Sequence, residues 1–271
     1  PRPGCAYLQT PVGNLERIVE REGLTAGEID HIDVEASLPT VLMESLSARH
    51  RDPSRGPSGV SPVNVTFSVP WGMALSLVGG LGPEGLGREF LAEHFDELRG
   101  LAGRVELRHD WSKTAAVLRG VSAGLDLGSL LRGRRLAGLL SGLAKVRRQH
   151  EHFSMMSEYA DLLAGGDWRR LYGSLRGPHD WEAFDLARAR FDELRFDFAS
   201  SVVVHTRDGA EHRESSARHR GAAGATIAER REVVRRKFLD AAERYGAPEA
   251  EDWWEAIGEL DEREAAEAGL R

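Results

Sequence analysis

The chain has 271 residues, 41% of them hydrophobic and 29% charged, which is ordinary for a folded protein able to bury one or two cores and favours that over disorder. Its net charge of −7 argues against a nucleic-acid partner, because binding nucleic acid requires a basic face that neutralises phosphates. The sequence has no long apolar run and its first residues form no leader segment, so we expect a cytoplasmic protein without a membrane partner. The single cysteine, Cys5, excludes an internal disulfide.

The first predicted element is a helix, because Val12, Leu15, Ile18 and Val19 recur at helical spacing between charged residues. Gly23 is expected to end it.

A half-buried strand is predicted next. Apolar Ile32 and Val34 alternate with polar His31, Asp33 and Glu35, which is the pattern of a strand with one buried face.

A polar stretch rich in proline and glycine, residues 51–62, is expected to form a surface loop before the apolar run VTFSVPWGMALSLVGG. Pro70 favours the first turn of a helix in that run, and Gly79 and Gly80 are expected to end it. The buried stripe of this helix comprises Met73, Ala74, Leu77 and Val78.

Another amphipathic helix is predicted over residues 90–98, followed by a strand in which Val105 and Leu107 alternate with charged residues. Two further strands, FASSVVVHT and AEHRESSA, are predicted to pair as a hairpin across Arg207-Asp208-Gly209, since Asp-Gly is a strong hairpin signal.

Residues 121–190 are predicted to form an all-helical insertion that carries a basic amphipathic helix. Such a helix can lie on a membrane surface, but it more often covers a core or a subunit interface, which is the interpretation we favour. His150 and His152 on a helix would point to different faces, so they predict no metal site. The sequence also lacks the standard nucleotide-binding, serine-hydrolase and zinc-protease motifs, and we expect no metal and no cofactor.

Three stretches in the same order resemble the second domain of the MmgE/PrpD family. The opening PRPGCAYLQTPVGNLERIVEREGLTAGEIDHIDVEA is similar to that domain's start, where a K-x-Y-P-x-C segment precedes a helix and an I-x-x-V-x-V strand. The run NVTFSVPWGMALSLVGG resembles the family's F-S-x-P-Y-A-x-A-x-x-L-x-x-G helix. The tail TIAERREVVRRKFLDAAERYG, with Trp253 and Trp254 after it, is similar to the family's closing helices.

Periodicity and resemblance together predict an α+β fold with a small, mostly antiparallel sheet packed against helices and a large all-helical insertion. Residues 1–120 and 191–224 are expected to form the α/β core, residues 121–190 the insertion, and residues 225–271 the C-terminal helices.

The family includes methylcitrate dehydratases, cis-aconitate decarboxylases and an iminodisuccinate epimerase. The resemblance therefore implies metal-free acid/base chemistry on a carboxylated small metabolite, by a lyase or isomerase. Family members build the site between this domain and a large helical domain, so we expect a separate helical partner subunit or self-association. The resemblance implies six substrate-binding residues: Cys5, Tyr7, Gln9, Asn64, Ser68 and Trp71.

Each of these residues also has a structural interpretation. Cys5 is more simply a buried thiol, and Tyr7 is equally well a core aromatic. Capping of the helix that starts at Pro70 is the favoured role of Ser68 and Asn64. For Trp71, stacking on a substrate and filling the core remain equally open.

The chain departs from the family pattern at positions that carry proton transfer, so the resemblance assigns no catalytic residue. The family's lysine would precede Pro1, and Arg2 stands at the position of the family's aromatic residue. Gln9 replaces a histidine, and Trp71 replaces a tyrosine, which removes an acidic hydroxyl.

Two other functions stay open beside a lyase or isomerase subunit. One is a non-catalytic binding or scaffold protein of the same fold. The other is a standalone biosynthetic isomerase or cyclase with a new site, for which the available histidines are His94, His109, His205 and His212.

Overall fold

The computed structural model describes residues 4–79, 84–124, 193–219, 221–222 and 225–267, which form two compact units that meet in sequence between Gly224 and Ala225. The first unit begins with α1 (Ala6–Glu22), β1 (Ile29–Ala36), α2 (Leu38–Ala48), the 3₁₀ segment η1 (Pro53–Gly59), α3 (Pro62–Thr66) and α4 (Val69–Val78). It continues with η2 (Glu84–Leu86), α5 (Arg88–Glu93), α6 (Phe95–Ala102), β2 (Val105–His109), α7 (Trp111–Gly124), β3 (Ser200–Thr206) and β4 (Glu211–Ser216). The second unit contains α12 (Ile227–Arg244) and α13 (Ala250–Glu267).

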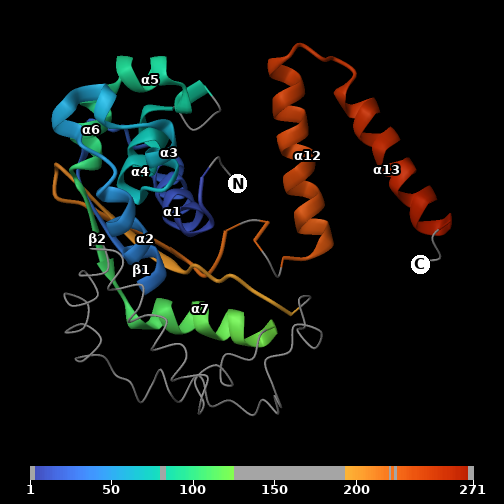
Figure 1. The fold of residues 1–271 in the computed structure, drawn as a ribbon, viewed down its shortest axis with the longest axis horizontal. Helices are drawn as coiled ribbons and strands as arrows, with labels where there is room; N and C mark the ends of the chain where they lie inside the picture. Colours follow the sequence, from blue (N-terminus) through green and yellow to red (C-terminus); the bar gives the residue numbers. More distant parts are fainter. Residues whose placement is uncertain (1–3, 80–83, 125–192, 220, 223–224, 268–271) are drawn as a thin grey trace, which may run out of the picture. The chain divides into compact units, whose positions relative to one another are not determined.

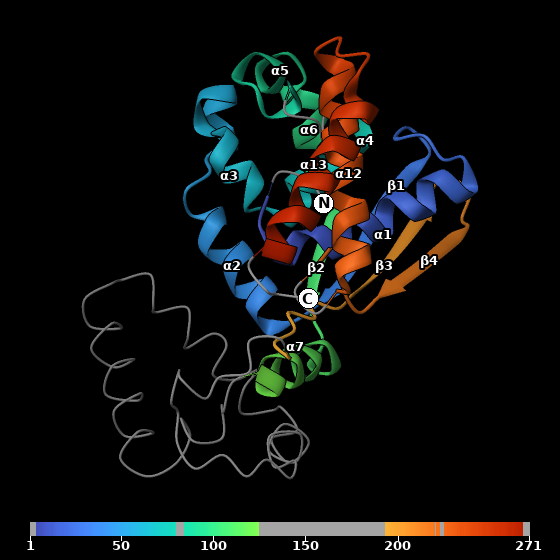
Figure 2. The ribbon, with the colours of Figure 1, turned by 90° about the vertical axis from the view of Figure 1, so that its right-hand side faces the viewer.

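The four described strands of the first unit (Figure 1) form one mixed sheet in the order β2-β1-β3-β4, and all four are labelled in Figure 2. β1 pairs with β2 in parallel and with β3 antiparallel, and β3 pairs with β4 antiparallel. A mixed α/β fold with a mostly antiparallel sheet agrees with the fold class predicted from the sequence.

The main core lies between this sheet and α1 (Figure 2). Alternate residues of the central strands point toward the helices, because side chains on a strand alternate between its two faces. Ile32, Val34, Val202 and Val204 are almost fully buried on this face. The predicted alternation of Ile32 and Val34 is therefore confirmed, and the opposite face of the sheet carries polar side chains.

Helix α4 is buried on several sides because it separates two apolar clusters. Val69 and Met73 belong to the core against the sheet, whereas Trp71 and Leu75 pack against α5 and α6. A helix that is apolar all round is typical of such an enclosed position. Its predicted limits are confirmed: Pro70 lies in the first turn, and Gly79 ends the helix with a φ of 84°.

The single helix predicted over residues 90–98 is wrong in one respect, because the structure has two helices, α5 and α6, that meet at His94. His94 has a φ of −99° and a ψ of 13°, outside the regular helix. Leu91, Phe95 and Leu98 are buried in one cluster on either side of the break. Their spacing revealed the buried face but not the interruption.

Other local predictions are confirmed. Gly23 ends α1 in the left-handed region with a φ of 67°. The Asp208-Gly209 turn joins β3 to β4, where the Thr206 N–H donates to the Ala210 carbonyl at 2.9 Å. Helix α2, which follows β1 directly, was not predicted from the sequence.

The predicted helical insertion, residues 121–190, lies almost entirely outside the described residues, as does the His150–His152 stretch. Among the helices that the structure describes, none has the combination of length and apolar character required to cross a bilayer.

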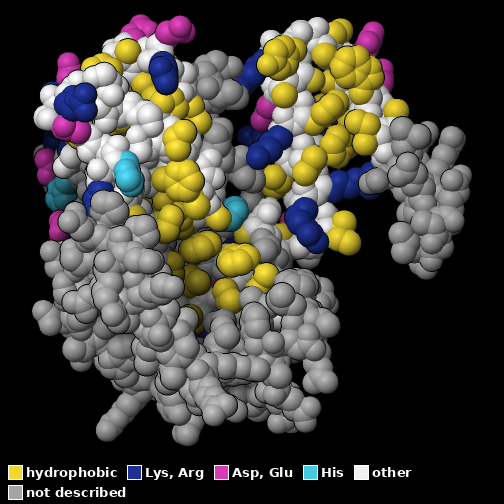
Figure 3. Space-filling model, viewed as in Figure 1, with side chains coloured by type: hydrophobic (Ala, Val, Ile, Leu, Met, Phe, Trp, Pro, Cys, Tyr) yellow, Lys and Arg dark blue, Asp and Glu magenta, His cyan; other side chains and the backbone are white. Residues whose placement is uncertain are grey.

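The second unit is a pair of helices. Thr226 and Glu229 form a capping box at the start of α12, and an Arg235–Glu251 ion pair of 2.7 Å joins the two helices. The rings of Phe238 and Trp254 pack with centroids 5.8 Å apart. Figure 3 shows hydrophobic side chains along this unit. Its exposed large apolar residues are Ile227, Val234, Tyr245, Trp253 and Ile257.

Candidate functional site

The opening segment and the proline-led segment, which carry most of the family resemblance, are in direct contact. The Cys5 N–H donates to the Thr66 carbonyl at 3.0 Å, and the Tyr7 hydroxyl donates to the Phe67 carbonyl at 2.7 Å. Both acceptors lie just before α4. The start of α1 and the entry to α4 therefore form one continuous region.

Most of the predicted substrate-binding side chains in this region are buried within the chain. Tyr7, Gln9, Ser68 and Trp71 are 3%, 8%, 0% and 5% exposed, respectively. Cys5 is partly exposed, as is Asn64, so it is these two that the structure leaves accessible to a ligand.

The buried residues have clear structural roles. Burial raises the pKa of Tyr7 far above its ordinary value, so its hydroxyl keeps its proton and donates to the Phe67 carbonyl. Ser68 caps α4 by accepting a hydrogen bond from the Trp71 N–H at 3.3 Å, which confirms the predicted cap. The Trp71 ring packs against Phe95 with centroids 5.9 Å apart.

Asn64 caps a different helix from the one predicted. Its side-chain oxygen accepts from the Ser61 N–H at 3.2 Å, and the Ser61 hydroxyl caps the Asn64 N–H, which completes a capping box on α3. The Gln9 side-chain amide donates to the Gly4 carbonyl at 3.5 Å.

A buried ion pair that the sequence analysis did not predict supports this region. Glu44 accepts hydrogen bonds from the Val69 N–H at 2.6 Å and from the Ser68 hydroxyl at 3.0 Å, and it pairs with Arg51. The side chains of Glu44 and Arg51 are only 11% and 7% exposed. The carboxylate thus satisfies the first free N–H of α4, that of Val69.

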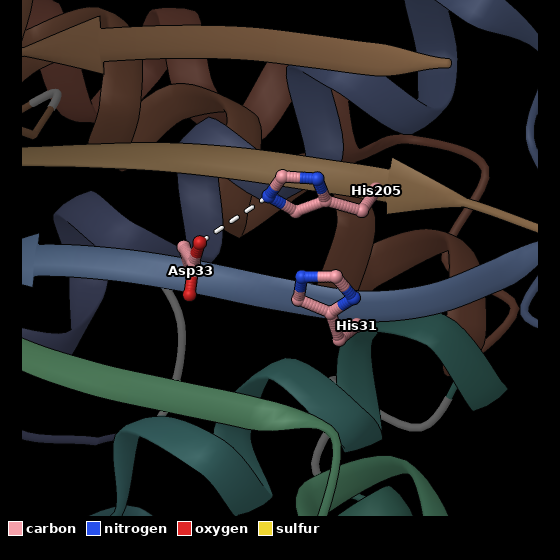
Figure 4. Close-up of side chains that lie close together, drawn as sticks. All are labelled: His31, Asp33 and His205. Atoms are coloured by element: carbon pink, nitrogen blue, oxygen red, sulfur yellow. Dashed lines mark hydrogen bonds and ion pairs between the residues drawn. The ribbon is translucent and has the colours of Figure 1, made fainter. Parts of the chain in front are cut away.

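A second cluster lies on the polar face of the sheet, away from the helices that cover the core. His31 and Asp33 are two residues apart on β1 and share this face, and His205 is the direct partner of His31 on β3. The imidazole rings of His31 and His205 stack with centroids 4.0 Å apart and an interplanar angle of 8°. Figure 4 shows both rings presenting a nitrogen on the side where Asp33 lies.

The polar contacts of the cluster extend across all four strands. His205 Nε2 lies 3.2 Å from Asp33 Oδ2, and its Nδ1 lies 3.5 Å from Glu211 on β4. Asp33 Oδ1 lies 3.7 Å from an Arg108 nitrogen on β2. His31 Nδ1 lies 2.9 Å from Asp30 Oδ2. This arrangement offers two imidazoles and a carboxylate to a ligand.

The alternation of His31 and Asp33 with Ile32 and Val34 predicts only that these two residues lie on the exposed side of a strand. A His-x-Asp pair on a strand places both side chains on one face, which was the available signal. Pairing with His205 could not be predicted, because it depends on which strand lies beside β1.

The histidines considered for a standalone site do not gather at one place. His212 lies on the opposite face of the sheet from His205, 3.4 Å from Glu22 of α1. His109 contacts the Thr114 hydroxyl at 2.8 Å, and burial lowers its pKa. His94 lies at the junction of α5 and α6.

Comparison with protein-family models and with curated proteins finds no match to this chain.

Proposed function

We propose that the chain is the α/β component of an MmgE/PrpD-type lyase or isomerase, which acts on a carboxylated small metabolite together with a separate helical subunit. The observation that carries the proposal is the contact between the two resembling stretches, through the Cys5–Thr66 and Tyr7–Phe67 hydrogen bonds. They are distant in sequence, and a site shared with a partner requires that they lie together.

In this proposal the chain lines part of the site and binds the metabolite, and the partner subunit supplies the groups that transfer protons. Tyr7 holds its proton in a hydrogen bond, and Trp71 replaces the family's tyrosine and is buried. Neither residue is suited to proton transfer at neutral pH. Cys5 and Asn64 remain as the accessible polar contacts on this side of the site.

Copurification and deuterium exchange test the proposal together. The tagged chain is expressed with its neighbouring genes, and a helical protein is expected to copurify. The complex is then incubated with cis-aconitate or 2-methylcitrate in D₂O, and NMR follows deuterium incorporation and turnover.

Cys5→Ala and Asn64→Ala are expected to lower turnover at least about tenfold, since each removes a positioned polar contact worth on the order of 1.4 kcal/mol or more. Arg99→Ala is the matched control, because its side chain is 52% exposed on the surface of α6. The proposal fails if no helical protein copurifies, or if both site variants behave like the control.

A second candidate, a non-catalytic scaffold of the same fold, is favoured by a different observation. Ile227 and Val234 on α12 and Tyr245 at its C-cap are 77%, 55% and 89% exposed, a large apolar exposure along one helix and its end. If these residues mediate self-association, Val234→Glu is expected to convert an oligomer into a monomer in sedimentation experiments. A chain that is monomeric at all concentrations would exclude this candidate.

A further inference from the structure

We propose that His31, Asp33 and His205 bind one divalent transition-metal ion on the polar face of the sheet. Two imidazoles and one carboxylate form a donor set that suits Zn²⁺ and related first-row ions and leaves coordination positions open. Within the part of the chain that the structure describes, these side chains are the one group with suitably placed ligand atoms. The site is independent of the proposed lyase function.

The distances within the cluster suit a small ion. In a tetrahedral zinc site with bonds of 2.0–2.1 Å, neighbouring ligand atoms lie about 3.3 Å apart. His205 Nε2 and Asp33 Oδ2 are already 3.2 Å apart. The ligand atoms of all three residues lie within 4.8 Å of one another, so a modest rotation of the His31 ring completes the set. That ring is 46% exposed and has room to turn.

Each imidazole has a carboxylate at its other nitrogen. Asp30 lies 2.9 Å from His31 Nδ1, and Glu211 lies 3.5 Å from His205 Nδ1. A histidine that ligates a metal almost always donates its second N–H to such a group, which fixes the tautomer and the ring orientation. Without a metal, His205 Nε2 donates to Asp33 Oδ2, and a bound metal would take the place of that proton. The two outer carboxylates would then hold the protons on the Nδ1 atoms, so that both Nε2 lone pairs face the metal.

Asp33 also has an unsatisfied oxygen. Its Oδ1 is buried and accepts no hydrogen bond from the described residues. The nearby Arg108 nitrogen is 3.7 Å away, beyond hydrogen-bonding distance, and Arg108 is held by Glu106 at 2.8 Å. Buried oxygens are rarely left without a partner, and a bound cation would supply one here.

The alternative is a row of surface ion pairs with two stacked rings and no ion. Isothermal titration of the chelator-treated full chain with ZnCl₂ distinguishes the two, with Co²⁺ absorption as a report on coordination. We expect the intact chain to bind one equivalent of Zn²⁺ and to give a visible absorption band with Co²⁺. Both should be lost in His31→Ala, Asp33→Asn and His205→Ala. Asp30→Asn should weaken binding about ten- to hundredfold, as removal of such supporting carboxylates does elsewhere.

His212→Ala is the matched control, because the His212 side chain has the same 21% exposure as that of His205 but lies on the other face of the sheet. It should leave the Zn²⁺ equivalent and the Co²⁺ band unchanged. Circular dichroism and urea unfolding without metal check that each variant folds. If His205→Ala does not fold, the isosteric Asp33→Asn and the exposed His31→Ala decide the question. The proposal is overturned if the intact chain binds no Zn²⁺ equivalent that depends on these residues, or if His212→Ala loses as much as they do.

Discussion

The Glu44–Arg51 ion pair provides the most direct test of how the region before α4 is held together. Glu44→Ala removes the acceptor of the Val69 N–H and the Ser68 hydroxyl, and it leaves Arg51 buried without a counter-charge. Breaking one side of a buried pair typically costs about 3–5 kcal/mol. We expect the free energy of unfolding to fall by about that amount.

Urea unfolding followed by tryptophan fluorescence measures the change. Glu44→Leu combined with Arg51→Met should recover most of the loss, because replacing both charges with apolar groups removes the unpaired ion. Arg21→Ala is the control: its side chain is 48% exposed and its partner Glu214 is only partly buried, so the loss of this pair should cost far less than the loss of Glu44. A loss below about 1 kcal/mol for Glu44→Ala would refute the reasoning.

Three further predictions concern stability. Asn14→Ala should cost about 2–3 kcal/mol in urea unfolding, because the fully buried Asn14 amide donates to the carbonyl and the hydroxyl of Ser200 at 3.0 Å each; a loss within error of zero would contradict this. Burial lowers the pKa of His109 in the folded chain below the ordinary histidine value of 6.5. As the pH falls below 6.5, the unfolded chain therefore binds more protons than the folded chain, and the free energy of unfolding should decrease. If the dependence of stability on pH is the same in His109→Gln, other groups cause the effect. Thr226→Ala should lower the stability of α12 by about 1 kcal/mol, seen as faster amide exchange in its first turn, while exchange in β1 stays the same.

Local features of the fold were predictable because they depend on neighbouring residues. The alternation around Ile32 gave β1, Pro70 and Gly79 gave the limits of α4, and Asp208-Gly209 gave the hairpin. Each signal acts over a few residues, through side-chain periodicity or the backbone preferences of proline and glycine.

Features that depend on distant residues were not predictable. The side chain of Trp71 suits either a ligand contact or a core position, and it is buried because α5 and α6 pack against it, with Phe95 beside its ring. The pairing of Glu44 with Arg51 depends on the path of the chain after α2. The His31–His205 stack requires β1 and β3 to be neighbours in the sheet, which no local pattern specifies.

The position of β1 in the sheet also bears on how the chain is made. Its Asp33 meets His205 across a separation of 172 residues, so one edge of β1 has no partner until the hairpin of β3 and β4 has been synthesised. At ribosomal rates of about 5–20 residues per second, that delay is roughly ten to thirty-five seconds. During this interval the nascent polypeptide exposes an unpaired strand edge beside an incomplete core. Another chain can pair with such an edge and start aggregation unless a chaperone covers it first. A truncated product ending before Ser200 would remain in that condition permanently.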